Sequence, residues 1–312
     1  MINRRHIRVK VMQSVYALLQ SKSDNLDKEE KFLYNSIDKM YDLYVSMLCL
    51  LVELGNKEKV HLEISQKKFL ATPEDLKPNS KFVNNQIFQL LGESISLNAY
   101  VEANNSNCWK LDSEYVNEIL KLTKSSKIYD VYMNSEKSSF QEDKEFIVAL
   151  FKEIIAPNEK LADYFEGENI SWVDDIPFVN TWIVKTLNQT KAEGTFHLGN
   201  LYKDHDDKKF VVELFRKVVL NHSEFEKDVM DKTPNWDADR IAEIDMILIK
   251  MAICEFLKFP SIPTRVTINE YIEISKDYST EKSSFFINGV LDKILKDFDA
   301  SKRMTKIGRG LL

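Results

Sequence analysis

Apolar residues recur every three to four positions along most of this chain, the spacing that gathers side chains on one face of an α-helix. The pattern is densest in residues 239–257, where almost no polar face remains, so we expect a buried central helix there. Its apolar positions are Ile241, Ile244, Ile247, Leu248, Met251, Ala252 and Ile253. Pro260 and Pro263 follow, and we expect the helix to end before them because proline has no backbone N–H to donate.

Two further helices are expected after these prolines. Thr267 and Glu270 have the spacing of a capping box, in which two side chains bind backbone N–H groups at the start of a helix. Ser279 is the expected N-cap of the last helix. The positions of that helix expected to face the core are Ile287, Val290, Leu291, Ile294 and Phe298.

Residues 4–22 have the pattern of an amphipathic helix with a basic start. Its apolar stripe consists of Ile7, Val11, Val15 and Leu18. Arg4 and Arg8 lie on the continuation and edge of that stripe, and guanidinium groups are not buried unpaired, so we expect the first turn or two to project beyond the core. A basic helix start opposes the helix dipole, which favours a binding role over a purely structural one.

The middle of the chain begins with an expected long helix over residues 27–54, whose apolar positions alternate four and three apart, as in a coiled-coil seam. They are Leu33, Ile37, Met40, Tyr44, Met47, Leu51 and Leu54. We favour packing in an ordinary bundle over a dimeric coiled coil. More helices are expected near residues 57–70, 81–98, 112–133, 141–155, 158–166 and 171–188.

The last of these middle helices should begin with a capping box formed by Ser171 and Asp174. It carries Trp172, Phe178 and Trp182, which we expect to anchor a small core. Residues 188–207, with two glycines, are the expected linker.

Composition supports an all-α protein. The 312 residues are 44% hydrophobic and 29% charged, with only 8 Gly and 7 Pro to interrupt helices. No apolar run of about 18 residues occurs, and the N-terminus lacks the features of a signal peptide, so we expect no membrane association. Cys49, Cys108 and Cys254 are widely separated, which fits a reducing cytoplasm and no metal.

Charge is distributed unevenly. Residues 1–23 carry five basic and no acidic side chains, and the tail from residue 301 carries four basic and none acidic. The rest of the chain holds 34 basic and 49 acidic residues, a net charge of −15. Basic ends on an acidic body favour a local site for a polyanion. For the tail, with Lys302, Arg303, Lys306 and Arg309, the alternative is a set of merely solvated charges.

Several short motifs resemble those of the NusB family of transcription antitermination factors. In the C-terminal part they are Arg240-Ile241, Asp245, Ala252, Ile262-Pro263, Ile268-Asn269-Glu270 and Phe286-Ile287-Asn288-Gly289-Val290-Leu291-Asp292. At the N-terminus they are Arg4-Arg5-x-x-Arg8, Gln13 and Tyr16. The run from Phe210 to Phe215 resembles the helix that precedes the C-terminal subdomain in the family. The resemblance implies a NusB-like bundle of two helical subdomains, interrupted by a helical insertion. The expected parts are residues 1–24 as first helix, 25–207 as insertion, 208–300 as the remaining body and 301–312 as basic tail.

The same resemblance implies that the arginine-rich segment contacts boxA RNA, with His6 standing where many members have another arginine. Independently, the outward side of the last helix combines Phe285 and, on its flank, Phe286 with lysines. Aromatic rings among lysines suit base stacking and phosphate binding. The alternative is that Phe285 or Phe286 packs against the insertion. The expected RNA-binding residues are Arg4, Arg5, Arg8, Tyr16, Tyr278, Lys282 and Phe286.

No catalytic motif is evident, and neither a cofactor nor a metal is expected. His197, His205 and His222, with Asp204, Asp206 and Asp207, are interpreted as a solvated charged stretch. Asp245, inside the central helix, should pair with Arg240 or Arg265.

The family resemblance implies a cytoplasmic, non-enzymatic RNA-binding factor in transcription regulation. It would bind boxA-type elements of nascent ribosomal RNA with the ribosomal protein NusE, in an RNA polymerase antitermination complex. The alternative is a NusB-like RNA- or protein-interaction scaffold, related to the accessory domain of rRNA methyltransferases. A third possibility is that the insertion mediates oligomerisation or a partner contact.

Overall fold

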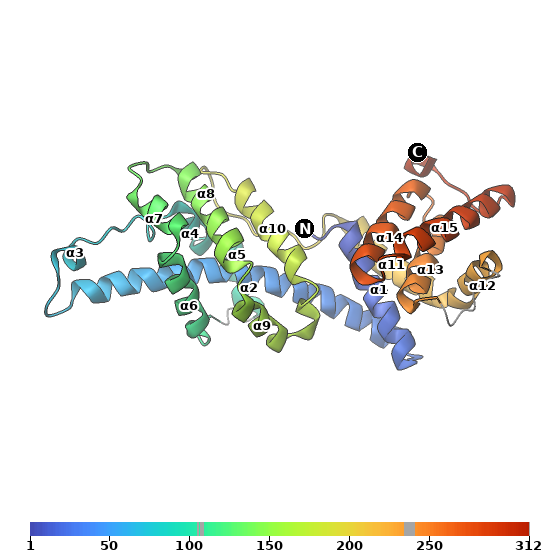
Figure 1. Ribbon diagram of the computed structural model, residues 1–312, viewed down its shortest axis with the longest axis horizontal. Coiled ribbons are helices and arrows are strands. Elements are labelled where there is room, and N and C mark those ends of the chain that lie inside the picture. Colours follow the sequence, from blue (N-terminus) through green and yellow to red (C-terminus); the bar gives the residue numbers. More distant parts are fainter. Residues whose placement is uncertain (105, 107–108, 234–240, 312) are drawn as a thin grey trace. The chain divides into compact units, whose positions relative to one another are not determined.

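The computed structural model describes residues 1–104, 106, 109–233 and 241–311, and every regular element in them is helical (Figure 1). The expected all-α class is therefore confirmed for the described part of the chain. No helix among these residues combines the length and apolar character needed to cross a membrane. Cys108 and Arg240 lie outside the described residues.

The chain divides into two compact units, of which the first joins both ends of the sequence. The terminal unit comprises Met1–Ile37 and Leu201–Leu312, and the middle unit comprises Asp38–Asn200. The expected insertion, residues 25–207, thus includes the whole middle unit together with residues 25–37 and 201–207, which pack in the terminal unit. Its proposed ends and the limits of the unit differ because helix α2 (Leu26–Gln66) runs from one unit into the other without a break.

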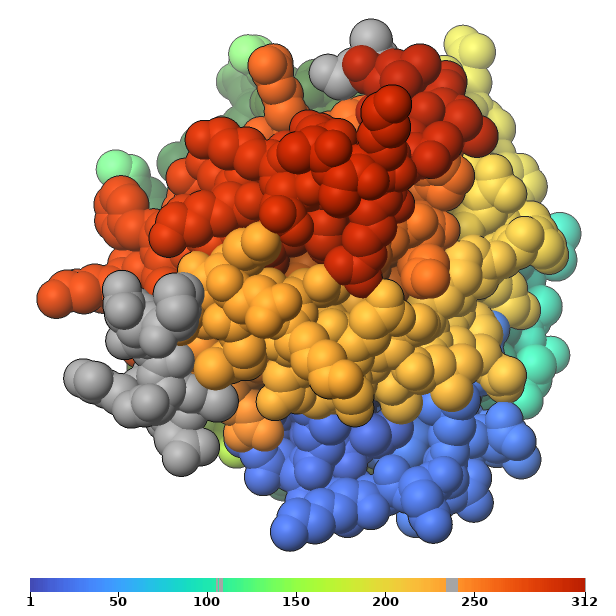
Figure 2. Space-filling model, turned by 90° about the vertical axis from the view of Figure 1, so that its right-hand side faces the viewer, coloured from blue at the N-terminus to red at the C-terminus, as the bar shows by residue number. Residues whose placement is uncertain are grey.

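The terminal unit is built around one buried helix. Besides the start of α2 it contains α1 (Arg4–Ser21), α11 (His205–Leu220), α12 (His222–Lys232), α13 (Glu243–Lys258), α14 (Thr264–Tyr278), α15 (Ser283–Ala300) and the 3-10 turn Gly308–Leu311. Helix α13 packs against α1, α11, α12, α14 and α15. Its residues from Ile247 to Phe256 are all buried, which confirms the expected central helix. Figure 2 shows residues of α11 and α12 lying between the start of the chain and its C-terminal segment on this unit's surface.

The ends of the C-terminal helices differ from those expected. Helix α14 already begins after Pro263 without a side-chain cap, so Thr267 and Glu270 lie within the helix and the predicted capping box is wrong. The last helix begins at Ser283, not after Ser279, and the hydroxyl of Ser279 instead donates to Asp245 Oδ1 at 2.6 Å. Asp245 therefore has a hydroxyl partner, whereas Arg240, one of the two arginines expected to pair with it, lies outside the described residues. In both cases the hydroxyl expected to cap a helix instead donates to a carboxylate of α13: Thr267 to Glu255 and Ser279 to Asp245.

Helix α1 matches its pattern closely. The Asn3 side chain caps it by accepting from the His6 backbone N–H at 2.8 Å. It ends at Lys22, whose backbone is left-handed with φ +49°. All four residues of the predicted apolar stripe are buried. The amphipathic pattern alone therefore placed this helix correctly.

The described residues of the middle unit form the remainder of α2 and eight shorter helices. They are α3 (Pro73–Leu76), α4 (Gln86–Gly92), α5 (Ile95–Asn104), α6 (Ser113–Lys124), α7 (Lys127–Asn134), α8 (Phe140–Leu150), α9 (Glu159–Glu168) and α10 (Ile176–Gln189). A π-helical turn, Phe151–Ile155, continues α8, and a 3-10 turn, Ile170–Trp172, precedes α10. The 3-10 turn is capped by Asn169, so the capping box predicted for Ser171 and Asp174 is wrong.

The long helix α2 has a fully buried seam. All seven residues of the expected coiled-coil pattern are at most 3% exposed. Within the middle unit, the ring of Tyr44 stacks on Trp182 with centroids 4.0 Å apart, and its hydroxyl lies 3.0 Å from that of Thr186. The seam is covered by the chain's own helices, as favoured from the sequence. Residues 27–54 and 57–70, expected as two helices, lie mostly in one continuous helix, so Gly55 does not end it. Gly55 lies against Phe88, whose ring would stand 3.0 Å from an added Cβ.

Candidate nucleic-acid interface

The start of α1 carries three arginines, and each one is bound to a carboxylate from a later helix. Arg4 donates through Nε to Asp207 Oδ1 at 2.8 Å, and its guanidinium lies 5.0 Å from the centre of the Phe210 ring. Asp207 belongs to the first turn of α11, and its backbone N–H is capped by Asp204. The Arg4 side chain is 41% exposed, whereas that of Asp207 is only 9% exposed.

Arg5 forms a two-bond pair with α14. Its Nε and Nη2 donate to Glu270 Oε2 and Oε1 at 3.1 and 2.9 Å. The hydrogen bond to Glu270 is the main reason that the pKa of Arg5 is raised. The Arg5 side chain remains 47% exposed, so its guanidinium is accessible from solvent while it is held.

Arg8 is different because it is buried. Its Nε and Nη2 donate to the two oxygens of Glu255 on α13, at 2.7 and 2.9 Å, and its Nη1 lies 3.5 Å from Glu270 Oε2. Burial alone lowers the pKa of Arg8, but the attraction of Glu255 outweighs it, and the pKa is raised. The expectation that the helix start projects beyond the core is therefore wrong for Arg8. A buried guanidinium is tolerated here because two carboxylates compensate it.

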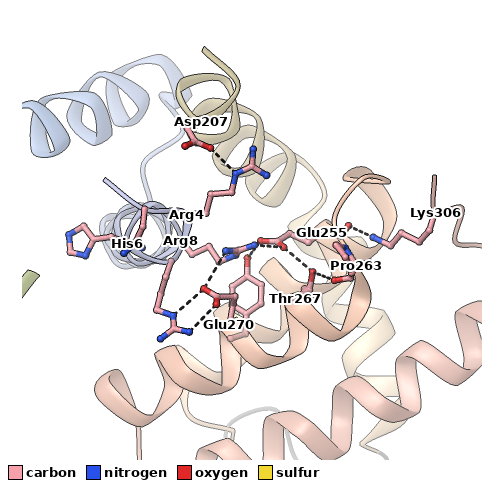
Figure 3. A network of polar contacts seen from close by, with 12 residues as sticks. Arg4, His6, Arg8, Asp207, Glu255, Pro263, Thr267, Glu270 and Lys306 are labelled. Carbon is pink, nitrogen blue, oxygen red and sulfur yellow. Dashed lines mark hydrogen bonds and ion pairs between the residues drawn. The ribbon is translucent and has the colours of Figure 1, made fainter. Parts of the chain in front are cut away.

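Glu255 is the centre of this network (Figure 3). Besides Arg8, it accepts hydrogen bonds from the hydroxyl of Thr267 at 3.0 Å and from that of Tyr271 at 2.7 Å. Burial in this place raises the pKa of Tyr271 well above its ordinary value, so the phenol stays a donor. Asp245 was the buried carboxylate expected from the sequence, whereas the role of Glu255 was not expected. The signal for Glu255 was its position next to Cys254 and Phe256, inside the apolar run of the central helix.

The remaining expected RNA-binding residues lie on three elements of the same unit. Tyr16 is exposed on α1, Tyr278 is the half-buried last residue of α14, and Lys282 is exposed just before α15. Phe286 is half-buried in the first turn of α15, whereas Phe285 is 82% exposed, as its position on the outward side predicted. The contacts of all these residues with RNA stay predictions.

Helix α14 connects the two groups. Glu270, which holds Arg5, and Tyr278 are eight residues apart on this helix, so about 12 Å separates them along its axis. Lys282 and Phe286 follow Tyr278 after one short turn, and the Phe286 N–H donates to the Lys282 carbonyl at 3.2 Å. The fold therefore places an exposed arginine and an aromatic, basic turn along one helix.

The basic tail is bound to the terminal unit. Arg303 pairs with Glu224 and Asp228 on α12, and Lys306 donates through Nζ to the carbonyls of Glu255 and Phe259, at 3.1 Å each. Burial lowers the pKa of Lys306 to about 8. The reading of the tail as merely solvated therefore does not describe these two cations, although Lys302 and Arg309 are exposed.

Two aspartates of the charged stretch at the start of α11 have structural roles. Asp204 caps the helix and Asp207 binds Arg4. Across the described residues, no group of three or more His, Cys, Asp or Glu side chains is arranged to hold a metal ion.

Comparison with known proteins supplies the family. The sequence profile of the NusB family matches residues 180–296. The transcription antitermination protein NusB of Salinibacter ruber is 41% identical over 112 residues, which are 36% of this chain and 70% of that protein. The NusB protein of Clostridium botulinum is 38% identical over 117 residues, 36% of this chain and 86% of that protein.

This chain belongs to the NusB family. The NusB protein of Chloroherpeton thalassium is also 38% identical, over 105 residues that make up 34% of this chain and half of that protein. No solved structure matches the chain significantly. The profile covers α11 to α14 completely and most of α15, so the family match includes Asp207, Glu255 and Glu270, the partners of the three arginines.

Proposed function

We propose that this NusB family member is an RNA-binding transcription antitermination factor. The relatives are named transcription antitermination proteins, and the observation that carries the proposal here is the set of arginines at the start of α1. Two of them are accessible yet held in place by carboxylates of the family-matched helices. Fixed, exposed guanidinium groups are well suited to bind phosphates.

The proposed contacts are of two kinds. Arg4, Arg5 and Lys282 bind phosphates, because their charged groups are accessible at the surface. Tyr16, Tyr278 and Phe286 stack on bases. Arg8, for which a phosphate contact was predicted, is only 2% exposed, and we propose that it acts instead by holding Glu255 and Glu270 in place.

The proposed ligand is a boxA-type element of nascent ribosomal RNA. The proposed partners are the ribosomal protein NusE and the RNA polymerase antitermination complex. The protein acts in the cytoplasm as a regulatory factor, without a cofactor and without catalysing a reaction. Family membership supports this assignment, and so does the combination of basic and aromatic side chains near α14.

A filter-binding experiment tests the proposal. Full-length protein is titrated against a boxA-like RNA and against a scrambled RNA of the same length and composition, with and without NusE. We expect tighter binding of the boxA-like RNA and a further gain with NusE. Equal affinity for both RNAs under both conditions would contradict the proposal.

A further inference from the structure

Arg4 and Arg5 are held by the same side of their guanidinium groups. Arg4 donates through Nε to Asp207, and Arg5 donates through Nε and Nη2 to Glu270. A guanidinium group has five N–H donors, so these bonds leave its far end, at Nη1, available for another acceptor. The side chains are 41% and 47% exposed, which allows a phosphate to approach that end while the carboxylate stays bound.

The two carboxylates are themselves held firmly. The Asp207 side chain is 9% exposed and projects from the capped first turn of α11. Glu270 is 20% exposed, and one of its oxygens also faces Arg8 Nη1 at 3.5 Å. Arg8 is fixed by the buried Glu255 and also faces Glu270 (Figure 3). Because Glu270 binds Arg5 in turn, charges of alternating sign lead from the core to the surface.

This arrangement has two physical effects on an approaching RNA. A side chain already fixed in its bound direction loses less conformational entropy on binding, which favours an RNA whose phosphates lie at the matching places. The carboxylates also offset the charge of the arginines, which weakens the sequence-independent attraction of any other RNA. Both effects increase the ratio of the affinity for an RNA with phosphates at the matching places to the affinity for any other RNA.

We propose that Asp207 and Glu270 are positioning residues that set the RNA selectivity of this site, by aiming Arg5 and Arg4 and by offsetting their charge. The inference rests on the proposed function, because it concerns the same RNA site. It assigns to the two acidic residues a role in discrimination, although neither has to touch RNA.

Glu270→Gln is the first test, since it removes the charge and keeps the size of the side chain. Affinities for a boxA-like and a scrambled RNA are measured by filter binding across a range of salt concentrations. We expect scrambled RNA to bind more tightly and boxA-like RNA to gain less or to lose, so that the selectivity ratio falls about threefold or more. The log–log salt dependence for scrambled RNA should steepen by about 0.7, because the freed Arg5 joins the phosphate contacts.

Glu273→Gln is the matched control. Glu273 is half-exposed on the same helix and pairs with Lys276. Its charge also raises the pKa of Arg5 without a bond between the two side chains. This variant removes the same charge, so we expect both RNAs to gain equally and the ratio to stay unchanged. If Glu270→Gln and Glu273→Gln change the two affinities alike, the proposal is overturned, because then only net charge matters.

Asp207→Asn provides a second, independent variant. It removes the charge that holds Arg4 and leaves Glu270 unchanged. The proposal can therefore be tested with this variant even if Glu270→Gln lowers the melting temperature strongly. We expect the ratio to fall here also, and an unchanged ratio in a variant that melts like wild type would contradict the proposal. A wild-type protein that binds both RNAs equally would instead contradict the proposed function itself.

Discussion

Arg8 of the first helix and Glu255 of the central helix meet in the core of the terminal unit, 247 positions apart in the sequence. Two hydrogen bonds, of 2.7 and 2.9 Å, join them, and their side chains are 2% and 0% exposed. The pair fixes α1 against α13 and supplies the inner end of the network that reaches Glu270 and Arg5.

Removing the arginine of this pair should destabilise the protein strongly. Arg8→Met leaves the Glu255 carboxylate buried without its cation, so we expect the free energy of unfolding to fall by about 3–5 kcal/mol in urea titrations. Arg4→Ala removes a half-exposed pair and should cost less than about 1 kcal/mol. The double variant Arg8→Met with Glu255→Met should recover much of the loss. A loss for Arg8→Met as small as that for Arg4→Ala would show that the pair is dispensable.

The exposed arginines should act on RNA through its phosphates. Changing Arg4 and Arg5 together to Ala should weaken boxA-like RNA more than scrambled RNA, because Asp207 and Glu270 hold both side chains toward the phosphates of the matching RNA. For the boxA-like RNA, the slope of log affinity against log salt should flatten by about 0.7 for each lost contact, or by about 1.4 for the pair. The measurement is filter binding at several salt concentrations. An unchanged slope in a stably folded variant would remove the start of α1 from the RNA site.

Phe286 should contribute to RNA binding by stacking. Phe286→Ala should lower RNA affinity by roughly 1–3 kcal/mol and leave the salt slope unchanged, since a ring contacts the base and not the charge. Phe285→Ala, at the neighbouring 82% exposed position, is the control and should leave the melting temperature near that of wild type. Should Phe286→Ala instead lower the melting temperature with RNA affinity intact, its ring serves packing only.

Lys306 should make stability depend on pH in the alkaline range. Burial lowers the pKa of its amine to about 8 in the folded chain, against an ordinary value of 10.5. At this amine, unfolding therefore takes up a proton between these values, and the contribution of Lys306 to the free energy of unfolding rises with pH from about 8 to 10.5. In Lys306→Met, which has no amine, the free energy of unfolding should therefore rise less, or fall more, between pH 7 and pH 10. Urea titrations of both proteins at pH 7 and pH 10 give the comparison, and parallel pH profiles would contradict the prediction.

The terminal unit should fold without the middle unit. Its core is made by residues before 38 and after 200, including Leu33 and Ile37, which are fully buried. Replacing residues 38–200 by a flexible linker of about ten residues should therefore leave a cooperative unfolding transition and a near-UV circular dichroism signal. Loss of that signal would mean that the middle unit is needed to order the terminal one.

The sequence by itself determined where most helices form and which faces they bury. Helical spacing of apolar residues is a local property, so α1, the seam of α2 and the central helix α13 could be read from it directly. The resemblance to the NusB family was likewise carried by short motifs, and the family match confirms it.

Only the tertiary structure decided what the polar side chains at these helices do. Thr267 and Glu270 have the spacing of a capping box, yet Thr267 donates to Glu255 and Glu270 accepts from two arginines. The reason is that α14 packs against α1 and α13. The carboxylates that hold Arg4 and Arg5 lie more than 200 positions away in the sequence. Burial of a charge depends on which partners the fold brings within about 3 Å, and no local pattern contains that information. Hence the sequence found the arginines, and the fold decided which of them stay exposed.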